Sequence, residues 1–404
     1  MALIVLLAGL VVLTLVLQDA FEVMLLPRRV KRRWRLTRYF YRWGWRVWTA
    51  LARVVPAGGR RERLLSIFGP LSMATLFTFW ASALIVAFGL LQWAAQQTGG
   101  TTAPSTFADQ LYLSGVTFFT LGYGDVVPHT PWARFLAVAE AGVGFGLIAI
   151  VIGYLPVLYQ LFSRREAHVL QLDARAGSPP SAVTLLRRHA ECAGLDKLDE
   201  FLRAWEIWGA ELLESHLSYP MLAYYRSQHH DQSWLGALAA VMDCCTLILV
   251  GVEDLKPLQA RMTFAMARQV VLEMARSLEV SAPRQTASDR LPPEDLNKML
   301  QLFQDAGLTW NGGENGAQTL NAVRATYEPL LQGLADHLLI PVPPWVAPDD
   351  ATDHWERGAR GIIASRLIGG LADGTISGAP TMRDPELRGW LGRLRKRPSP
   401  TDRT

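Results

Sequence analysis

Charged residues are absent from a long stretch of this sequence, since none occurs between Arg63 and Asp109. A second absence overlaps the first, because Gln96–Pro131 contains no Lys or Arg. A water-soluble domain needs charged side chains on its surface, so these absences exclude a chain that is soluble throughout. Residues 180–404, in contrast, have the charge content of an ordinary soluble domain.

Cysteine is also scarce. The three cysteines are Cys192, Cys244 and Cys245, and no Cys-x-x-Cys pair occurs. This excludes a disulfide-rich secreted fold and a four-cysteine metal site. We interpret all three as reduced thiols in a cytosolic part of the protein.

Motifs for nucleotide binding and catalysis are missing as well. No Gly-x-Gly-x-x-Gly follows a predicted strand, and neither a P-loop nor a nucleophile motif is present. His189 with Cys192, and His229-His230-Asp231, lack a complete set of metal ligands. The sequence therefore predicts no cofactor, no bound metal beyond a permeant ion, and no enzymatic activity.

Three apolar runs are long enough to cross a bilayer as helices, which takes about 20 residues. They are Met1–Leu17, Ser66–Ala95 and Phe135–Phe162. A cleaved signal peptide, the alternative for the first run, needs basic residues before the apolar stretch, and here they follow it. We therefore predict an N-terminal transmembrane helix within 1–27. Pro70 is expected near the start of the second helix, where a missing N–H does no harm.

The distribution of basic residues predicts the orientation of these helices. Between Arg28 and Arg63 there are thirteen Arg or Lys and one acid, Glu62. Because Lys and Arg in short loops stay on the cytoplasmic side, the segment 28–65 is predicted to be cytoplasmic and Gln96–Pro131 external. The N-terminus is then outside and the large C-terminal domain in the cytosol, in a multi-pass protein of the cell (plasma) membrane.

The external segment contains a short apolar stretch, Phe107–Phe119, that suits a re-entrant helix. It leads directly into Thr120-Leu121-Gly122-Tyr123-Gly124-Asp125. With an apolar run on either side, this order resembles the potassium-channel pore family over about Leu71–Phe162, within a predicted pore domain 66–165. The resemblance implies an outer helix, a pore helix, a selectivity filter and an inner helix, with K⁺ as the permeant ion.

The chemistry of K⁺ accounts for the residues of this filter. The ion must shed its water, and rings of backbone carbonyls replace it. Gly122 and Gly124 can adopt the conformations that point consecutive carbonyls at one axis. We expect Thr120 to add hydroxyl oxygens at the inner end, Tyr123 to brace the filter, and Asp125 to concentrate cations at the outer mouth. Since one chain contains one motif and a filter needs four, we predict a homotetramer.

Two positions in the third apolar run carry further hypotheses. By resemblance, Gly144 lies near the point where the inner helix bends, although glycine also serves close helix packing, and both interpretations stay open. Glu140 is an ionisable group inside a span, and we expect it to hydrogen-bond behind the filter.

The segment 28–65 repeats arginine at helical spacing, with aromatic residues in between. The stripe consists of Arg35, Arg38, Arg42 and Arg46. This pattern is typical of a helix on an anionic membrane surface, so membrane lipids are predicted partners. A voltage sensor is disfavoured because it needs partner helices with acids, and nucleic acid because the segment is tied between two spans. Charge that only sets the topology remains an alternative.

Beyond the pore, apolar residues recur every three and four positions, which predicts helices. The segments concerned are 198–208, Leu255–Val280, Asn297–Leu308 and Thr319–Leu339. We therefore predict a linker over 166–180, an all-α cytosolic domain over 181–392 and a disordered basic tail over 393–404. Trp234–Val252 is apolar enough for a fourth span, but Asp243 at its centre favours a buried core helix.

The predicted fold class is thus an all-α membrane protein with three transmembrane helices, a re-entrant pore helix and an all-α cytosolic domain. Passive conduction of K⁺ is the leading functional hypothesis. The alternative is a membrane-bound sensor whose helical domain signals to a partner, with a pore that is non-selective or silent. No motif identifies the cytosolic regulator or the gating signal, and the domain is expected to aid assembly or to act on the inner helix through Ser163–Leu172.

Overall fold

The computed structural model describes residues 2–26, 35–56, 58–98, 106–191, 194–227, 231–253, 255–283, 289–312, 315–348 and 351. All but the last belong to one compact unit, Met1–Asp349. Within these ranges the regular structure is helical, apart from one isolated β-bridge between Val252 and Trp310. The predicted all-α fold is therefore confirmed, while Cys192, His229-His230 and the tail 393–404 lie outside the described residues.

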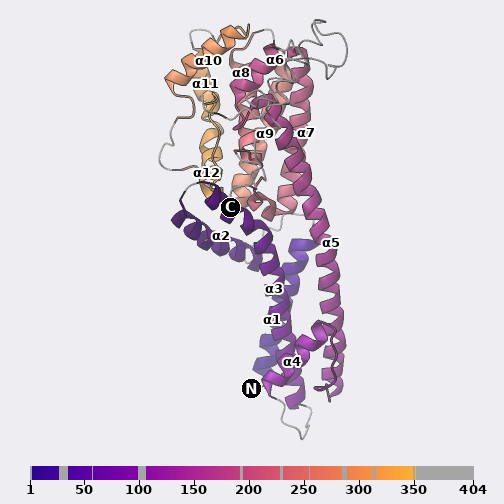
Figure 1. Cartoon of the computed structure of the whole chain (residues 1–404). Coiled ribbons are helices and arrows are strands. Elements are labelled where there is room, and N and C mark those ends of the chain that lie inside the picture. Colours follow the sequence, from indigo (N-terminus) through magenta and orange to yellow (C-terminus); the bar gives the residue numbers. More distant parts are fainter. Residues whose placement is uncertain are drawn as a thin grey trace, which may run out of the picture. The chain divides into compact units, whose positions relative to one another are not determined.

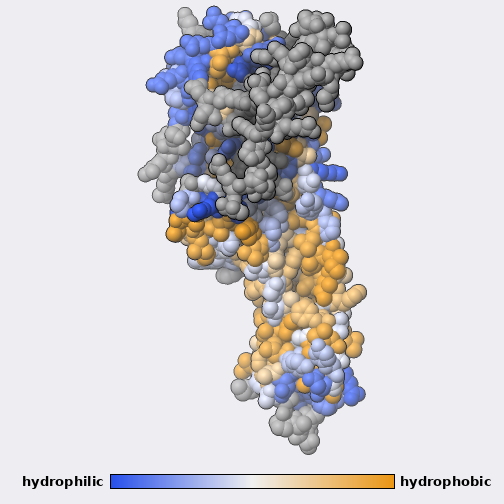
Figure 2. Space-filling model, in the orientation of Figure 1, coloured by the Kyte–Doolittle hydropathy of each residue, from blue (hydrophilic) through white to orange (hydrophobic). Residues whose placement is uncertain are grey.

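The first part of the chain contains three long apolar helices and two shorter ones. They are α1 (Ala2–Met24), α2 (Leu36–Val54), α3 (Gly59–Thr98), α4 (Phe107–Phe118) and α5 (Pro131–Ala176) (Figure 1). By length and composition α1, α3 and α5 can each cross a membrane, which confirms the three predicted spans. On the face that Figure 2 shows, the surface over these helices is mainly hydrophobic.

Two of the long helices extend beyond the predicted spans. Because α3 begins at Gly59, Pro70 lies inside the helix, and its expected place at the helix start was wrong. With 46 residues, α5 is about 69 Å long, against a hydrocarbon core of about 30 Å. The segment 166–180, predicted as a linker, is helical up to Ala176 because Val169, Leu172 and Ala176 are buried in the core of the C-terminal part.

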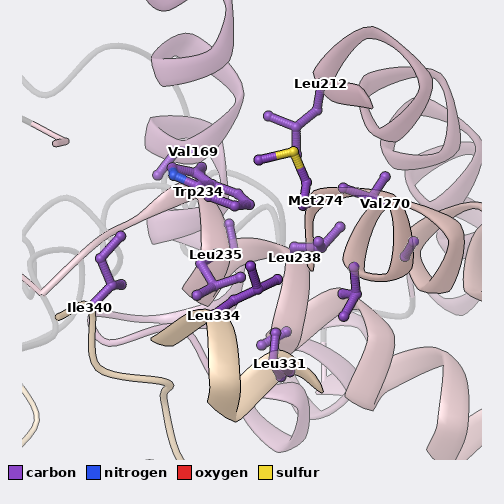
Figure 3. Packing of buried hydrophobic residues seen from close by; sticks show 14 of the residues in the cluster. Val169, Leu212, Trp234, Leu235, Leu238, Val270, Met274, Leu331, Leu334 and Ile340 are labelled. Atoms are coloured by element: carbon purple, nitrogen blue, oxygen red, sulfur yellow. The ribbon is translucent and has the colours of Figure 1, made fainter. Parts of the chain in front are cut away.

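The C-terminal part consists of short helices around one buried helix. They are α6 (Ala182–Glu191), η1 (Leu195–Lys197), α7 (Leu198–Ser218), η2 (Pro220–Tyr224), α8 (Trp234–Val250), α9 (Pro257–Leu278), α10 (Pro293–Asp305), α11 (Gly316–Arg324) and α12 (Glu328–Leu338). We call 182–348 the C-terminal helical domain. Side chains from α5, α7, α9 and α12 surround Trp234, Leu235 and Leu238 of α8 (Figure 3).

Helix α8 is a core helix and not a span, as its central acid indicated. Asp243 is 1% exposed and accepts hydrogen bonds from Arg290 Nη2 at 2.5 Å and from the Tyr327 hydroxyl at 2.6 Å. Arg290 also donates to Glu328 and to the Pro343 carbonyl. Each buried charge therefore has partners, which is the condition under which burial of an ion pair is tolerated.

The corner between α1, α2 and α3 is built around another buried acid. Asp19 of α1 accepts hydrogen bonds from the backbone N–H of Thr37 at 3.2 Å and from the Thr37 hydroxyl at 2.5 Å. It also accepts one from Trp80 Nε1 of α3 at 3.0 Å. Asp19 thus caps the N-terminus of α2, where unpaired N–H groups and the helix dipole favour a negative charge.

Candidate ion-conduction site

The pore helix α4 is defined at both ends by backbone hydrogen bonds. At its start Thr106 and Asp109 form a capping box, in which each side chain accepts from the backbone N–H of the other. At its end the N–H of Leu121 donates to the Val116 carbonyl at 2.8 Å and the N–H of Thr120 to Thr117 at 3.0 Å. The filter segment therefore begins directly at the C-terminal, negative end of the helix dipole.

The filter backbone alternates between two conformations. Thr120, Gly122 and Gly124 have positive φ angles of 56°, 59° and 79°, whereas Leu121 and Tyr123 do not. A φ that changes sign from one residue to the next can turn successive peptide planes so that their carbonyls face one side. This is the arrangement that a row of carbonyl ligands for a bare cation requires, and it leaves Thr120 in a conformation that is strained for a residue with a Cβ.

The side chains of the filter make few contacts within one chain. Leu121 is 55% and Tyr123 69% exposed. The predicted bracing by Tyr123 is therefore not formed within the described part of one chain, and it stays a prediction. Asp125 has a neighbour that sequence reasoning missed, because its carboxylate lies close enough to the Tyr112 hydroxyl of α4 for the two groups to interact.

Glu140 lies where the three helices α3, α4 and α5 meet. It is fully buried, and its carboxyl group contacts Gln92 of α3 and Ser114 of α4. Gln92 Nε2 donates to Glu140 Oε2 at 2.6 Å, and the Ser114 hydroxyl also lies 2.7 Å from the Ile85 carbonyl of α3. Glu140 thus forms hydrogen bonds with Gln92 and Ser114, which the sequence did not single out, and its predicted place behind the filter and its role in gating stay predictions.

Gly144 lies where α5 crosses the end of the pore helix. A Cβ at this position would be 2.4 Å from the Phe118 carbonyl oxygen, so no larger residue fits without a shift of the backbone. This contact supports the packing interpretation of Gly144, and its hinge role stays a prediction. A residue that sequence reasoning passed over, Pro156, lies inside α5 and removes one hydrogen bond of the helix.

The arginine stripe lies on and beside α2, and most of it has partners within the chain. Arg35 lies 3.4 Å from Glu22, while Arg38 and Arg42 both pair with Glu279, at the C-terminal end of α9. Arg46 lies over the Trp43 ring, with its guanidinium carbon 5.5 Å from the ring centroid. The role of these arginines toward lipid therefore stays a prediction, and Glu279 is a partner that local spacing could not reveal.

These features agree with a known family of proteins over part of the chain. Residues 73–160 match the family described as "Ion channel". Residues 73–160 are an ion-channel pore domain. They contain most of α3, all of α4 and the filter, and the part of α5 with Glu140 and Gly144. No solved structure matches the chain.

The similarity to curated proteins is distant or short. The uncharacterized membrane protein YdjJ of Bacillus subtilis (strain 168) is 23% identical over 224 residues, which are 54% of this chain and 62% of the relative. Protein LctB of Geobacillus stearothermophilus is 33% identical over 84 residues, 18% of this chain and 62% of the relative. Two-pore potassium channel 5 of Arabidopsis thaliana is 46% identical over 44 residues, 11% of each chain. The chain thus spans less than two thirds of each of these relatives.

Proposed function

We propose that this protein is a subunit of a K⁺-selective channel that conducts passively. The observation that carries the proposal is the alternating backbone of 120–124, at the C-terminal end of α4 and between two membrane-spanning helices. Carbonyls aligned in this way can replace the water of a K⁺ ion at little cost in reorganisation. The short match to a two-pore potassium channel supports the same ion.

Assembly as a homotetramer follows from the same chemistry, because one chain supplies one quarter of the ligand rings. The inner helix supports it. Its residues at a spacing of seven form an apolar stripe along α5 that the chain itself leaves uncovered, with exposed fractions of 66–75%: Val138, Phe145, Ile152 and Tyr159. In a tetramer the inner helices of neighbouring subunits would cover this stripe, or the side chains of the stripe would line the pore.

The proposed orientation in the cell membrane has the N-terminus and the filter outside and the C-terminal helical domain in the cytosol. It rests on the basic residues that precede α3 and on the absence of Lys and Arg from Gln96–Pro131. In this orientation α2 lies at the cytoplasmic surface, between the ends of α1 and α3.

We propose further that α2 lies in the interfacial layer of the cytoplasmic leaflet. One of its faces, with Tyr41 and Trp45, is buried against the rest of the chain. Another face is apolar and exposed, with exposed fractions of 55–84% at Trp43, Val47, Leu51 and Val54. The helix contains no acidic residue, so Arg46 and Arg53 match the negative charge of anionic headgroups.

Flux measurements on the purified protein in liposomes test the conduction proposal. We expect K⁺ flux well above Na⁺ flux. Gly122→Ala should lower K⁺ flux at least about tenfold, because a Cβ at a φ of 59° is strained by roughly 1–2 kcal/mol in each of four subunits. Gly59→Ala, at the start of α3 with no atom within 4 Å of the added Cβ, is the matched control and should leave flux unchanged.

The outcomes separate the hypotheses. Equal K⁺ and Na⁺ flux would contradict K⁺ selectivity and indicate a non-selective cation pore. Assembled protein that passes no ion, with or without candidate cytosolic factors and anionic lipids, would favour the alternative function as a membrane-bound sensor.

A further inference from the structure

A short segment of the C-terminal helical domain lies between the two pore-forming helices α3 and α5. It runs from Tyr219 to Arg226 and includes η2. We call it the aromatic wedge, because three of its eight residues are tyrosines that pack against both helices. Its contacts reach α2, α3, α5 and α12.

On the side of the outer helix α3, the ring of Tyr225 packs directly against Gly69. A Cβ at Gly69 would be 2.8 Å from the ring of Tyr225, so the ring occupies the space that any other residue would fill. The Tyr225 hydroxyl donates to the sulfur of Met73, one helical turn further along α3, at 3.4 Å. The preceding tyrosine, Tyr224, stacks on Tyr41 of α2, with ring centroids 5.7 Å apart and ring planes 11° from parallel.

On the side of the inner helix α5, one arginine holds the wedge by its backbone. Arg165 is 4% exposed and donates to the Leu222 carbonyl at 2.9 Å and to the Tyr225 carbonyl at 2.7 Å. Its charge is balanced by Glu166 at 2.9 Å, and its guanidinium lies over the Phe162 ring. Two strong, charge-assisted bonds thus fix the wedge to α5, just beyond the predicted span Phe135–Phe162.

The wedge is also fastened to the C-terminal helical domain. Arg226 donates to the carbonyls of Leu338 and Leu339 at the end of α12, at 2.6 and 3.0 Å, and contacts Glu62 of α3 at 3.1 Å. His216 of α7, just before the wedge, lies 3.3 Å from Arg165. A displacement of α7 or α12 would therefore move the wedge relative to α3 and α5.

We infer that the aromatic wedge is the element through which the C-terminal helical domain sets the inner gate, with Arg165 as the positioning residue. This rests on the proposed channel function. An inner mouth widens only if α5 moves relative to α3 near the cytoplasmic end of the span Phe135–Phe162. Tyr225 of the wedge contacts both helices there, at Gly69 of α3 and Phe162 of α5. The C-terminal helical domain is thus coupled to the pore in two ways: through the continuous chain Ser163–Leu172, and through the contacts of the wedge with α3 and α5.

Single-channel recording of the full chain in planar bilayers tests the inference. Arg165→Gln removes the guanidinium group that donates to the Leu222 and Tyr225 carbonyls of the wedge. We expect the open probability to change by about tenfold or more, with unitary conductance and K⁺ selectivity unchanged. Arg164→Gln is the matched control: it removes the same charge from the neighbouring, exposed position. It should change open probability less than about twofold, since surface charges contribute little.

A second pair of variants approaches the wedge from the other side. Gly69→Ala should displace the Tyr225 ring and also change the open probability, whereas Gly44→Ala, whose added Cβ has its nearest neighbour at 4.0 Å, should not. In a Tyr225→Ala background, Gly69→Ala should lose most of its effect, because the ring with which it collides is gone. A purely structural role would instead lower the yield of tetramers or alter conductance, and coupling between the two sites would be absent.

The outcomes separate this inference from the channel proposal. A wild-type protein without K⁺ flux overturns the proposed function and the inference together. A conducting wild type whose Arg165→Gln and Gly69→Ala variants keep the wild-type open probability overturns the wedge alone. If Arg165→Gln does not assemble, Arg165→Lys, which keeps the charge but cannot reach both carbonyls, carries the same expectation.

Discussion

At the scale of single residues, the one hydroxyl hydrogen of Ser114 determines which hydrogen bonds join the pore helix α4 to α3 and α5. Ser114 has one hydrogen to donate, yet both the Ile85 carbonyl and Glu140 Oε1 lie within reach of its oxygen. Both contacts are hydrogen bonds only if Ser114 donates to Ile85 and Glu140 donates to Ser114. A protonated Glu140 also accepts from Gln92 Nε2, so both oxygens of its carboxyl group take part in hydrogen bonds.

This arrangement makes opposite predictions for two substitutions of Glu140. Glu140→Gln keeps a donor for Ser114 and an acceptor for Gln92, so we expect K⁺ flux within about threefold of the wild type. Glu140→Ala leaves the buried Gln92 amide without its acceptor and Ser114 with only its bond to the Ile85 carbonyl. An unpaired buried group costs roughly 1–3 kcal/mol in each subunit, so this variant should reduce tetramer stability and flux at least tenfold. Liposome flux and the thermal dissociation of tetramers are the measurements. A strong loss in the Gln variant would show that Glu140 acts as an anion.

The sequence identified Glu140 but not its partners, and the reason is distance along the chain. A lone acid in an apolar run is conspicuous, because burial of a charge is costly. Gln92 and Ser114 are 48 and 26 residues away and of common type, so only the packing of α3, α4 and α5 selects them.

At the scale of elements, the side chains of α2 face three different environments. Tyr41 and Trp45 face the chain, Arg38 and Arg42 face Glu279, and the apolar row with Trp43 and Val47 is uncovered. The sequence predicted a basic helix at the membrane. The structure assigns two of its arginines to a carboxylate on α9 and leaves apolar side chains as the surface available to lipid.

A fluorescent label on one introduced, exposed cysteine tests where α2 lies, since the native Cys244 and Cys245 are buried. In a Cys192→Ser background, a label at Val47→Cys should be quenched by brominated lipids, because the position lies within the interfacial layer. A label at Ile207→Cys on α7 is the matched control, since Val47 and Ile207 are apolar and 58% and 56% exposed. Equal quenching at both positions would place α2 in water and contradict the interfacial proposal.

At the scale of the whole molecule, a buried ionic network holds the C-terminal helical domain together. Asp243 of α8 joins Arg290 and Tyr327, and Arg290 reaches Glu328 of α12 and the loop at Pro343. Four segments that are far apart in the sequence thus share one set of hydrogen bonds. Since the domain also holds the end of α5, its stability bears on the pore.

Loss of Asp243 should therefore destabilise the domain. Asp243→Ala leaves the Arg290 charge buried with fewer partners, and we expect a loss of about 3–5 kcal/mol in the free energy of unfolding. The midpoint of thermal unfolding of the full chain in detergent should fall by roughly 6–15 °C. Asp305→Ala, at an exposed position of α10, serves as the control and should move the midpoint by less than about 2 °C. Equal midpoints for the two variants would show that the network adds no stability.

The sequence by itself determined the features that depend on local chemistry. The length of the apolar runs defines α1, α3 and α5, and the glycines at 122 and 124 permit the alternating filter backbone. Tertiary structure alone decided the pairing of Arg42 with Glu279, 237 residues away, and the fit of Tyr225 against Gly69. Local patterns set what a segment can become, whereas contacts across the chain depend on how all the helices pack at once.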